Sequence, residues 1–441
     1  MIDGLNYLCS EIAEAINGNM IGKDEKIESI TINSKENSNC PSCFFAIKGK
    51  RYNGADFIDE AIQNGAKLIV TQEKIYCSVT VIYVENVVVA LGLLAKRHKG
   101  NTRVIAITGS NGKTTTKDMV ISVLGAKYSV CGTKGNFNNE IGVSLTLLSI
   151  KKEDFCVVEM GMRGFGEIEW LSYISEPEIS VITNCATAHI EKLGSKSNIF
   201  KAKTEILKYT KKYAILPYEK RFKRLRCEGI KKIYPQKEHK IKNIKKIKNA
   251  IILDIDKCKN IKLDSIYLHD ANNALIAYKI GFMLGLDDNQ IKLGLEQFRK
   301  ENNRGKVLEV NNIQILNDCY NASYESTRNA ILAIKAQFPC KKIAVLLGDM
   351  LELGEKSKKF HVKIGRLCKR AKIEKMYVYG RFALNYKKGY GGGKKIDELN
   401  EIPITLISEL DETYALLIKA SNSMNFEKII EQMREIKNDI F

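Results

Sequence analysis

The chain has 441 residues, more than one hydrophobic core can organise, so we expect about three domains. Its 44% hydrophobic content is typical of globular proteins, and no apolar run approaches the roughly 18 residues of a membrane span. The N-terminus has no basic stretch leading into an apolar core, so the sequence predicts no export signal. Twelve scattered cysteines, most of them inside apolar runs, favour reduced thiols in the cytoplasm over a disulfide framework.

The net charge of +19 is concentrated in one segment. Residues 201–250 carry fifteen lysines and three arginines against four glutamates. Such a block can bind nucleic acid or attract an anionic substrate, but the stretch 240–248 interleaves lysine with isoleucine and has no aromatic side chain for base stacking. We therefore favour a solvated surface on an exposed amphipathic strand or helix, and we expect no nucleic-acid partner.

Residues 1–100 predict a small α/β domain. The expected elements, in order, are a strand at 43–49, a helix at 56–64, a strand at 67–70 and a helix at 87–98. Gly65 is placed to end the first helix, and the break at Gly100 marks the domain boundary. Cys40 and Cys43 have the spacing of a zinc knuckle, but no second pair completes it, so we do not expect zinc.

A glycine-rich turn between a strand and a helix is the most informative motif in the chain. It is Thr108-Gly-Ser-Asn-Gly-Lys-Thr-Thr-Thr116, and it follows the apolar run 103–107 and precedes an expected helix at 117–124. Its glycines turn backbone N–H groups inward, Lys113 adds a charge for the outer phosphates, and Thr114 offers a hydroxyl to Mg²⁺. The loop is shorter than the usual Walker spacing, and a plain tight turn is the alternative. The strand expected before the loop and the helix expected after it favour a nucleoside triphosphate site.

Residues 101–302 alternate strands and helices, as expected of a parallel sheet whose ligands bind at the strand C-termini. Glu159 follows the strand 155–158, and His189 lies shortly after the strand 179–183. A carboxylate and an imidazole in these positions suit a divalent cation shared with the phosphates. Taken alone, Glu159 could instead cap the next turn, and His189 could be an ordinary loop histidine.

Strand–helix alternation restarts in residues 303–441. The expected elements are strands at 342–347, 375–379 and 415–419 and an amphipathic helix at 426–438. The whole chain is therefore expected to be an α/β protein of three domains. These are a small N-terminal domain, a central nucleotide-binding domain with a parallel or mixed sheet, and a Rossmann-like C-terminal domain.

In this order the motifs resemble those of the Mur ligases, the ATP-dependent amino-acid ligases of peptidoglycan precursor synthesis. The phosphate loop alone indicates only the superfamily, and the more selective segments are 136–142, 159–161 and 347–354. The resemblance covers nearly the whole chain, with further matches at Ala188-His-Ile-Glu191, Lys201-Ala-Lys-Thr-Glu-Ile206, His269 to Ala274, Asp318-Cys-Tyr-Asn-Ala322 and His361.

The resemblance implies one domain each for a UDP-sugar substrate, for ATP and for the incoming amino acid or dipeptide. It implies that ATP phosphorylates the free carboxylate of a UDP-N-acetylmuramoyl tripeptide, and that the amine of D-alanyl-D-alanine attacks the acyl phosphate. This route is reasonable because a carboxylate is a poor acyl donor, whereas phosphate is a good leaving group. The third tripeptide residue, diaminopimelate or lysine, stays open. We expect a cytoplasmic monomer.

The resemblance also implies roles for single residues around ATP. Lys113 is expected to hold the outer phosphates, and Thr114, Glu159 and His189 to ligate Mg²⁺. Lys203 corresponds to a lysine that becomes carbamylated and binds a second Mg²⁺, so that two cations hold the γ-phosphate and the carboxylate together. The alternative for Lys203 is one more surface lysine in the basic block. Nucleotide contacts are expected from Thr108, Gly109, Ser110, Asn111, Gly112, Lys113, Thr114, Thr115, Asn273 and Asp318.

Substrate contacts are implied for Ser34 in a uridine pocket, for Asn138 and Asn139 in the acceptor groove, and for Tyr320 and Asn321 near the dipeptide or a domain interface. The sequence departs from the family pattern at several of these places. Asn33-Ser34-Lys35 stands where Asp-Ser-Arg is usual, and the arginine that opens the third domain is either Arg304 or a lysine at position 306. These departures concern substrate contacts and leave the phosphate loop intact.

Two other hypotheses remain. A relative within the superfamily could add a different amino acid, or glutamate as polyglutamate-type ligases do. A non-catalytic nucleotide-binding protein could instead use residues 201–250 to bind RNA or DNA, which would make its binding salt-sensitive. The intact set of Lys113, Thr114, Glu159, His189 and Lys203 argues against a degenerate enzyme.

Overall fold

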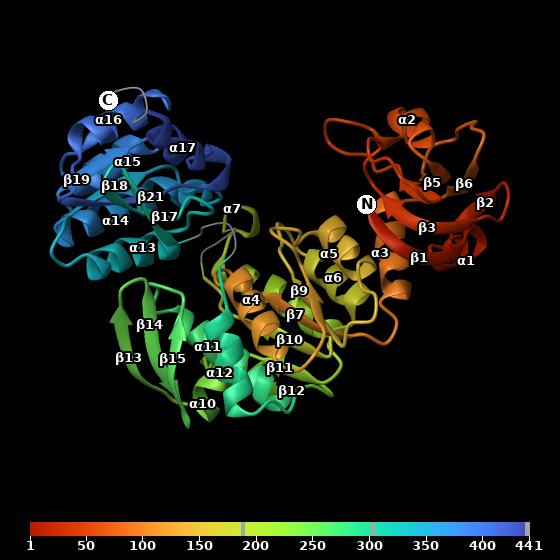
Figure 1. Ribbon diagram of the computed structural model, residues 1–441, viewed down its shortest axis with the longest axis horizontal. Helices are drawn as coiled ribbons and strands as arrows, with labels where there is room; N and C mark the ends of the chain where they lie inside the picture. Colours follow the sequence, from red (N-terminus) through yellow and green to blue (C-terminus); the bar gives the residue numbers. More distant parts are fainter. Residues whose placement is uncertain (187–189, 301–304, 437–441) are drawn as a thin grey trace.

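The computed structural model describes residues 1–186, 190–300 and 305–436. Its elements form four β-sheets, arranged in a red N-terminal unit, a central unit and a blue C-terminal unit (Figure 1). The central unit lies between the other two, and both of them face the same side of it (Figure 1). No helix within these ranges has the length and apolar character needed to cross a bilayer.

The N-terminal unit is a six-stranded sheet with strand order β1-β3-β4-β5-β6-β2. Its strands are β1 (Ile2–Leu8), β2 (Asn19–Ile21), β3 (Lys26–Thr31), β4 (Ser42–Phe45), β5 (Ala66–Thr71) and β6 (Thr80–Tyr83), and its helices are α1 (Cys9–Ala15), α2 (Ile58–Gln63) and α3 (Val87–His98). The helix expected at 56–64 is split, because the side chain of Asn53 accepts the Ala55 N–H and starts a 3₁₀ turn at Gly54–Phe57 before α2. The strand at 67–70 and the helix at 87–98 are confirmed.

The central sheet is parallel throughout and has the strand order β12-β11-β10-β7-β9-β8. Its strands are β7 (Arg103–Thr108), β8 (Val130–Gly132), β9 (Phe155–Glu159), β10 (Ile179–Ile182), β11 (Tyr213–Ile215) and β12 (Lys231–Ile233). After β7, the chain forms β8 and β9 on one side of that strand. It then forms β10 on the other side. This change of direction leaves a crevice at the carboxyl end of β7, where open parallel sheets bind their ligands.

Within the described residues, five α-helices lie between β7 and β11, and they carry several of the predicted site residues. They are α4 (Lys113–Leu124), α5 (Glu140–Leu148), α6 (Glu167–Ser175), α7 (Ile190–Leu193) and α8 (Lys196–Thr204). The helix expected at 117–124 therefore begins four residues earlier, directly at the lysine of the glycine-rich turn. The phosphate loop and the first turn of α4 form one continuous structure.

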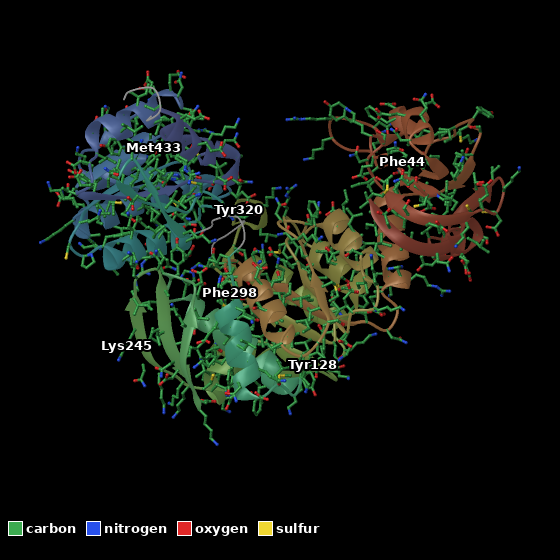
Figure 2. The ribbon with its side chains drawn as sticks, viewed as in Figure 1. Phe44, Tyr128, Lys245, Phe298, Tyr320 and Met433 are labelled. Atoms are coloured by element: carbon green, nitrogen blue, oxygen red, sulfur yellow. The ribbon has the colours of Figure 1, made fainter. Side chains whose placement is uncertain are left out.

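A three-stranded antiparallel sheet follows, formed by β13 (Ile241–Ile247), β14 (Ala250–Ile255) and β15 (Cys258–Leu263). Its inner face packs on α11 (Asp270–Met283) and α12 (Asp288–Gln297), while α9 (Lys220–Lys223) and α10 (Pro235–Glu238) precede it. The basic stretch 240–248 is strand β13 at the edge of this sheet, and Lys245 extends from it into solvent (Figure 2). Lysines on an edge strand keep the open edge from pairing with another chain.

The C-terminal unit is a six-stranded sheet with order β16-β17-β21-β18-β19-β20, parallel except for the hairpin of β16 and β17. Its strands are β16 (Lys306–Val310), β17 (Ile313–Asn317), β18 (Lys342–Leu347), β19 (Lys375–Val378), β20 (Lys394–Lys395) and β21 (Tyr414–Lys419). Its helices are α13 (Tyr324–Gln337), α14 (Ser357–Arg370), α15 (Ala383–Tyr390), α16 (Glu401–Glu409) and α17 (Glu427–Glu435). All three strands expected in this part of the chain are confirmed.

Candidate active site

The phosphate loop is closed by contacts that leave room only for glycine. A Cβ on Gly109 would lie 1.9 Å from the hydroxyl oxygen of Thr183, and Gly112 caps α4 with a φ of 79°. The Nζ of Lys113 donates to the carbonyl of Gly109 at 3.0 Å, so its side chain folds back over the loop. The N–H groups of the first turn of α4 and the Lys113 ammonium therefore lie at the same end of the helix, an arrangement suited to an anion.

The end of β10 fixes the loop from the other side. Asn184 accepts the Asn111 N–H at 3.1 Å through its Oδ1, and its Nδ2 donates to the Asn111 carbonyl at 2.8 Å. The Thr183 hydroxyl donates to the same carbonyl at 2.7 Å. Both residues were missed in the sequence, although the strand that carries them was predicted. The available signal was that the strand expected at 179–183 ends at two adjacent polar residues, Thr183 and Asn184.

Glu159 ends β9 and faces the first turn of α4. Its side chain is buried; Oε2 accepts the Thr114 hydroxyl at 2.7 Å, and Oε1 accepts the Asn138 amide at 2.8 Å. The backbone N–H groups of the next two residues donate elsewhere, Met160 to Ile107 and Gly161 to Asn138. The carboxylate is thus aimed at the phosphate loop and does not cap the turn that follows it.

The oxygen atoms around Glu159 fit Mg²⁺. Mg²⁺ prefers hard oxygen ligands and commonly takes only one or two carboxylates, with phosphates and waters completing its shell. The Thr114 hydroxyl and the Glu159 carboxylate are such ligands, side by side. No cluster of three acidic, histidine or cysteine side chains with metal-binding geometry occurs in the described part of the chain, so substrate oxygens would be needed. His189, the third expected ligand, lies outside the described residues.

Lys203 on α8 is not a surface lysine, although the composition of its segment favoured that interpretation. Its side chain is only 1% exposed. Burial, together with the positive charge of Lys113, lowers the pKa of Lys203 to about 7. A substantial fraction of the amine is therefore neutral and nucleophilic at neutral pH.

Asn273 on α11 reaches the phosphate loop. A Cβ on Gly112 would lie 3.0 Å from its Oδ1, and its Nδ2 donates to Asp270 at 2.9 Å. Asp270 is buried and pairs with the Lys300 ammonium at 2.6 Å. Burial opposes ionisation of Asp270, but Lys300 and His269 outweigh it and lower the pKa of Asp270 to about 2. Asp270 was also missed in the sequence, where it is one more acidic residue at a helix start.

One cavity of about 690 Å³ brings most of the predicted site residues together. It is lined from the central unit by the phosphate loop, Glu159 and the segment 136–142, and from the C-terminal unit by Tyr320, Asn321 and Glu352. Figure 2 shows Tyr320 where the C-terminal unit faces the central one. The predicted residues on its wall are Ser110, Asn111, Gly112, Lys113, Thr114, Thr115, Asn138, Asn139, Glu159, Tyr320 and Asn321.

Six described residues predicted for the site lie off this wall, Gly109 and Lys203 among them. The Ser34 hydroxyl donates to Glu60 within the N-terminal unit, and Thr108 donates to the Met160 carbonyl beneath the loop. Asp318 accepts the Lys419 ammonium at 2.7 Å in the C-terminal unit. Asn273 lies behind Gly112. Asn139 is on the wall, but its Oδ1 caps α5 by accepting the Gly142 N–H at 2.9 Å.

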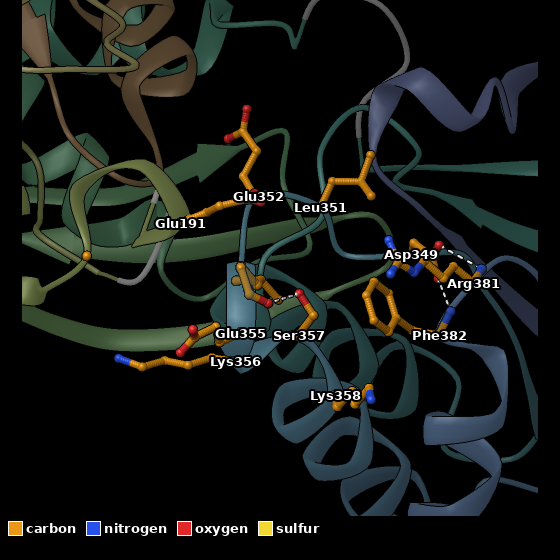
Figure 3. Close-up of a pocket in the computed structure, with 13 residues that line it drawn as sticks. Glu191, Asp349, Leu351, Glu352, Glu355, Lys356, Ser357, Lys358, Arg381 and Phe382 are labelled. Carbon is orange, nitrogen blue, oxygen red and sulfur yellow. Dashed lines mark hydrogen bonds between the residues drawn. The ribbon is translucent and has the colours of Figure 1, made fainter.

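A second cavity of about 790 Å³ lies between α7 and the C-terminal unit (Figure 3). Glu352 lines both cavities, and its carbonyl accepts the Glu191 N–H across the two units at 3.2 Å. Asp349 accepts the backbone N–H groups of Arg381 and Phe382 at 2.9 and 3.0 Å, which joins two loops of its wall (Figure 3). The lining carries both carboxylates and basic groups, Lys356, Lys358 and Arg381 among them.

The Asp270–Lys300 pair should make stability sensitive to acid. Because the folded-state pKa of Asp270 is about 2, against roughly 3.9 in an unfolded chain, the pair stabilises the fold above pH 4. Its contribution, about 2 to 3 kcal/mol, is lost as the pH falls from 4 toward 2. Asp270→Asn should lower the free energy of unfolding at pH 7 and flatten its decrease below pH 4.

Urea unfolding at several pH values, followed through the single tryptophan, measures this change. Asp59→Asn, at an exposed position on α2, is the matched control and should leave both stability and its pH dependence unchanged. If the stability of wild type and of Asp270→Asn fell equally with acid, the Asp270–Lys300 pair would not be the source of the acid sensitivity.

Family models match all three parts of the chain. The Mur ligase family catalytic domain matches residues 26–99, the Mur ligase middle domain residues 107–281, and the Mur ligase glutamate ligase domain residues 303–437. The chain is 31% identical to UDP-N-acetylmuramoyl-tripeptide–D-alanyl-D-alanine ligase of Bacillus subtilis, over 89% of this chain and 90% of the relative. It is 32% identical to the Haemophilus influenzae protein of the same name, over 96% and 98%.

Solved structures agree with the sequence relatives. MurF from Acinetobacter baumannii superimposes with a TM-score of 0.91 at 25% identity, covering 98% of this chain and all of that one. MurF ligase from Thermotoga maritima, solved in complex with ADP, gives 0.82 at 30% identity over 92% and 97%. These matches confirm the three-part α/β fold. Since relatives above 30% identity extend over nearly its full length, the chain belongs to the Mur ligase family.

Proposed function

We propose that this Mur ligase uses ATP to join D-alanyl-D-alanine to UDP-N-acetylmuramoyl-tripeptide. The observation that carries the proposal is the 690 Å³ cavity, where the phosphate loop and Glu159 face Tyr320 and Asn321 of another unit. An enzyme that must unite three substrates needs a chamber of this kind between its parts. The names of the relatives at 31% and 32% identity supply the substrates.

Each of the three units is proposed to bind one substrate. We assign the UDP-sugar to residues 1–100, ATP to residues 101–302 and the dipeptide to residues 303–441, with Ser34 in the uridine pocket. We propose a monomer as the working form. ATP and nucleotide sugars are made inside the cell, which supports the cytoplasm as its location.

ATP is held by residues at the carboxyl end of β7. The N–H groups of residues 112–115 and the Lys113 ammonium surround the β- and γ-phosphates, and the α4 N-terminus adds its dipole. Asn273, tied to Asp270, is placed for the adenine, and Asp318 reaches the nucleotide from the C-terminal unit. The Thermotoga maritima relative was solved with ADP, which supports a nucleotide in this fold.

We assign two Mg²⁺ ions to the site. Thr114 and Glu159 would hold the first, with His189 as a further ligand, and a carbamylated Lys203 would hold the second. When bound, the ions neutralise phosphate charge and draw the γ-phosphate and the acceptor carboxylate together. A buried lysine with a pKa of about 7 supports carbamylation, because only the neutral amine attacks carbon dioxide.

The reaction proceeds in two stages. An oxygen of the tripeptide carboxylate, placed along Asn138 and Asn139, attacks the γ-phosphorus and releases ADP, giving an acyl phosphate. The dipeptide amine then attacks the acyl carbon, and the tetrahedral intermediate expels phosphate and forms the peptide bond. Lys113 stabilises the charge that develops on the transferred group.

We place the dipeptide on the C-terminal side, near Tyr320 and Asn321, with the 790 Å³ cavity as its route of entry. A zwitterionic dipeptide needs both signs of charge, and that cavity carries Glu191 and Glu355 as well as Lys356 and Arg381. Glu352 lies on both cavities and connects this route to the phosphate loop. The dipeptide amine can therefore arrive beside the acyl phosphate without displacing ATP.

Phosphate release measured with ATP, UDP-N-acetylmuramoyl-tripeptide and a set of amines tests the proposal. D-alanyl-D-alanine should give the fastest release, by about tenfold or more, since a site built for a dipeptide loses contacts with a single residue. Release that is equal with single amino acids, or faster with glutamate, would favour a ligase of different specificity. Salt-sensitive RNA binding without any turnover would favour the non-catalytic hypothesis.

Lys203→Ala tests the carbamate. Activity should fall by about 100-fold or more, and short carboxylates such as acetate or formate should restore part of it by occupying the space of the carbamate. Lys201→Ala, at an exposed position on the same helix, is the matched control and should retain wild-type activity. Full activity of Lys203→Ala without added carboxylate would show that no carbamate is needed.

A further inference from the structure

Lys117 is a buried charged residue that the reaction described above does not use. It lies on α4, four residues after Lys113, but its side chain is only 1% exposed. Its Nζ donates to the carbonyl of Thr133 at 2.5 Å and lies 2.8 Å from the carboxylate of the neighbouring Asp118. Burying an ammonium is costly even when it is paired, so its retention here calls for an explanation.

The partner of Lys117 is connected to the candidate metal ligand. Thr133 directly follows the edge strand β8, and its hydroxyl oxygen accepts the backbone N–H of Glu159 at 3.0 Å. Its own N–H donates to the Val157 carbonyl at 3.0 Å, so Thr133 is attached to β9 on both sides of residue 158. Whatever fixes Thr133 therefore also fixes the end of β9.

The contacts form a closed ring that begins and ends on α4. Lys117 holds Thr133, Thr133 holds the Glu159 backbone, and the Glu159 carboxylate accepts the hydroxyl of Thr114 at 2.7 Å. Thr114 and Lys117 are three residues apart and share one face of the helix. The same helix turn thus fixes the backbone and the carboxylate of Glu159.

We propose that Lys117 is a positioning residue that sets the Glu159 carboxylate for Mg²⁺ at the phosphate loop. The inference rests on the proposed function only in so far as that site takes Mg²⁺ with a nucleotide. Lys117 acts through Thr133 and touches no substrate. Partners of this kind orient metal ligands, and their loss typically weakens metal binding by about 10- to 100-fold.

Lys117→Met tests the proposal, because methionine keeps the length and apolar stem of lysine and removes its ammonium. Mg²⁺ is titrated into protein with saturating ADP, and binding is followed by calorimetry. The concentration for half-saturation should rise about 10- to 100-fold, while the affinity for ADP without Mg²⁺ stays near wild type. Neither measurement needs the tripeptide or the dipeptide, so a wrong ligase assignment would leave this test intact.

A second readout uses the protein alone. Amide hydrogen exchange at Glu159 should quicken in Lys117→Met, because the Thr133 hydroxyl that accepts this N–H is no longer held. Thr133→Val keeps the shape of residue 133 and removes the hydroxyl, so it should raise the Mg²⁺ requirement likewise. The double variant should be no worse than the more impaired single variant, since both changes break one ring. Thr133→Val also tests the ring if Lys117→Met does not fold.

The matched control is Lys99→Met. Lys99 is also buried and paired, to Glu176 at 3.3 Å, but it follows α3 away from the phosphate loop. Its loss should leave the Mg²⁺ requirement and the exchange at Glu159 unchanged. A wild-type Mg²⁺ requirement in both Lys117→Met and Thr133→Val would overturn the proposal, and so would an equal change in Lys99→Met.

Discussion

The end of β7 is held between its two parallel neighbours, and the rest of the site depends on this constraint. β9 brings Glu159 beside Ile107, and β10 brings Ile182 beside Thr108, so three strands end at one edge of the sheet. Asn184 then fixes the phosphate loop from one side, while Glu159 faces α4 from the other. A loop whose N–H groups are fixed before ligand arrives loses little freedom on binding, which favours both affinity and catalysis.

This arrangement also explains why the C-terminal unit must approach the central one. The central unit supplies the phosphate loop and the segment 136–142, but the wall on the proposed dipeptide side comes from Tyr320, Asn321 and Glu352. Contacts between the units supply that wall, since Ser323 lies 3.4 Å from the Asn111 amide oxygen and Glu352 accepts the Glu191 N–H. Contacts between the central and C-terminal units therefore lie beside both the phosphate loop and the proposed dipeptide route.

Much of the fold could be predicted because its signals are local. The strands around the phosphate loop are short apolar runs ending in polar residues, and the glycines of the loop leave few alternatives. The position of Glu159 near the phosphate loop could also be predicted, because it follows a strand and parallel strands bind ligands at their carboxyl ends. The helix expected at 56–64 was wrong in its first turn, because a side-chain cap from Asn53 decided where helical structure begins.

Other features depend on contacts between distant segments and leave no local signal. Lysine is common in this chain, so the sequence does not distinguish Lys117 and Lys203, which are buried, from Lys245, which is solvated. The contact of Asn184 with the phosphate loop depends on β10 lying beside β7, and the sequence does not show which strands are neighbours. The cavity between Glu159 and Tyr320 is lined by residues about 160 positions apart in the sequence, and no periodicity encodes the approach of the units that carry them.

The central claim is that the acceptor carboxylate itself receives the γ-phosphoryl group in this cavity. An acceptor labelled with ¹⁸O in its terminal carboxylate tests it most directly. Turnover with ATP and D-alanyl-D-alanine should release phosphate that carries one ¹⁸O per peptide bond formed, because the attacking carboxylate oxygen leaves with the phosphate. Unlabelled phosphate accompanying full peptide formation would contradict the acyl-phosphate route and the geometry proposed for it.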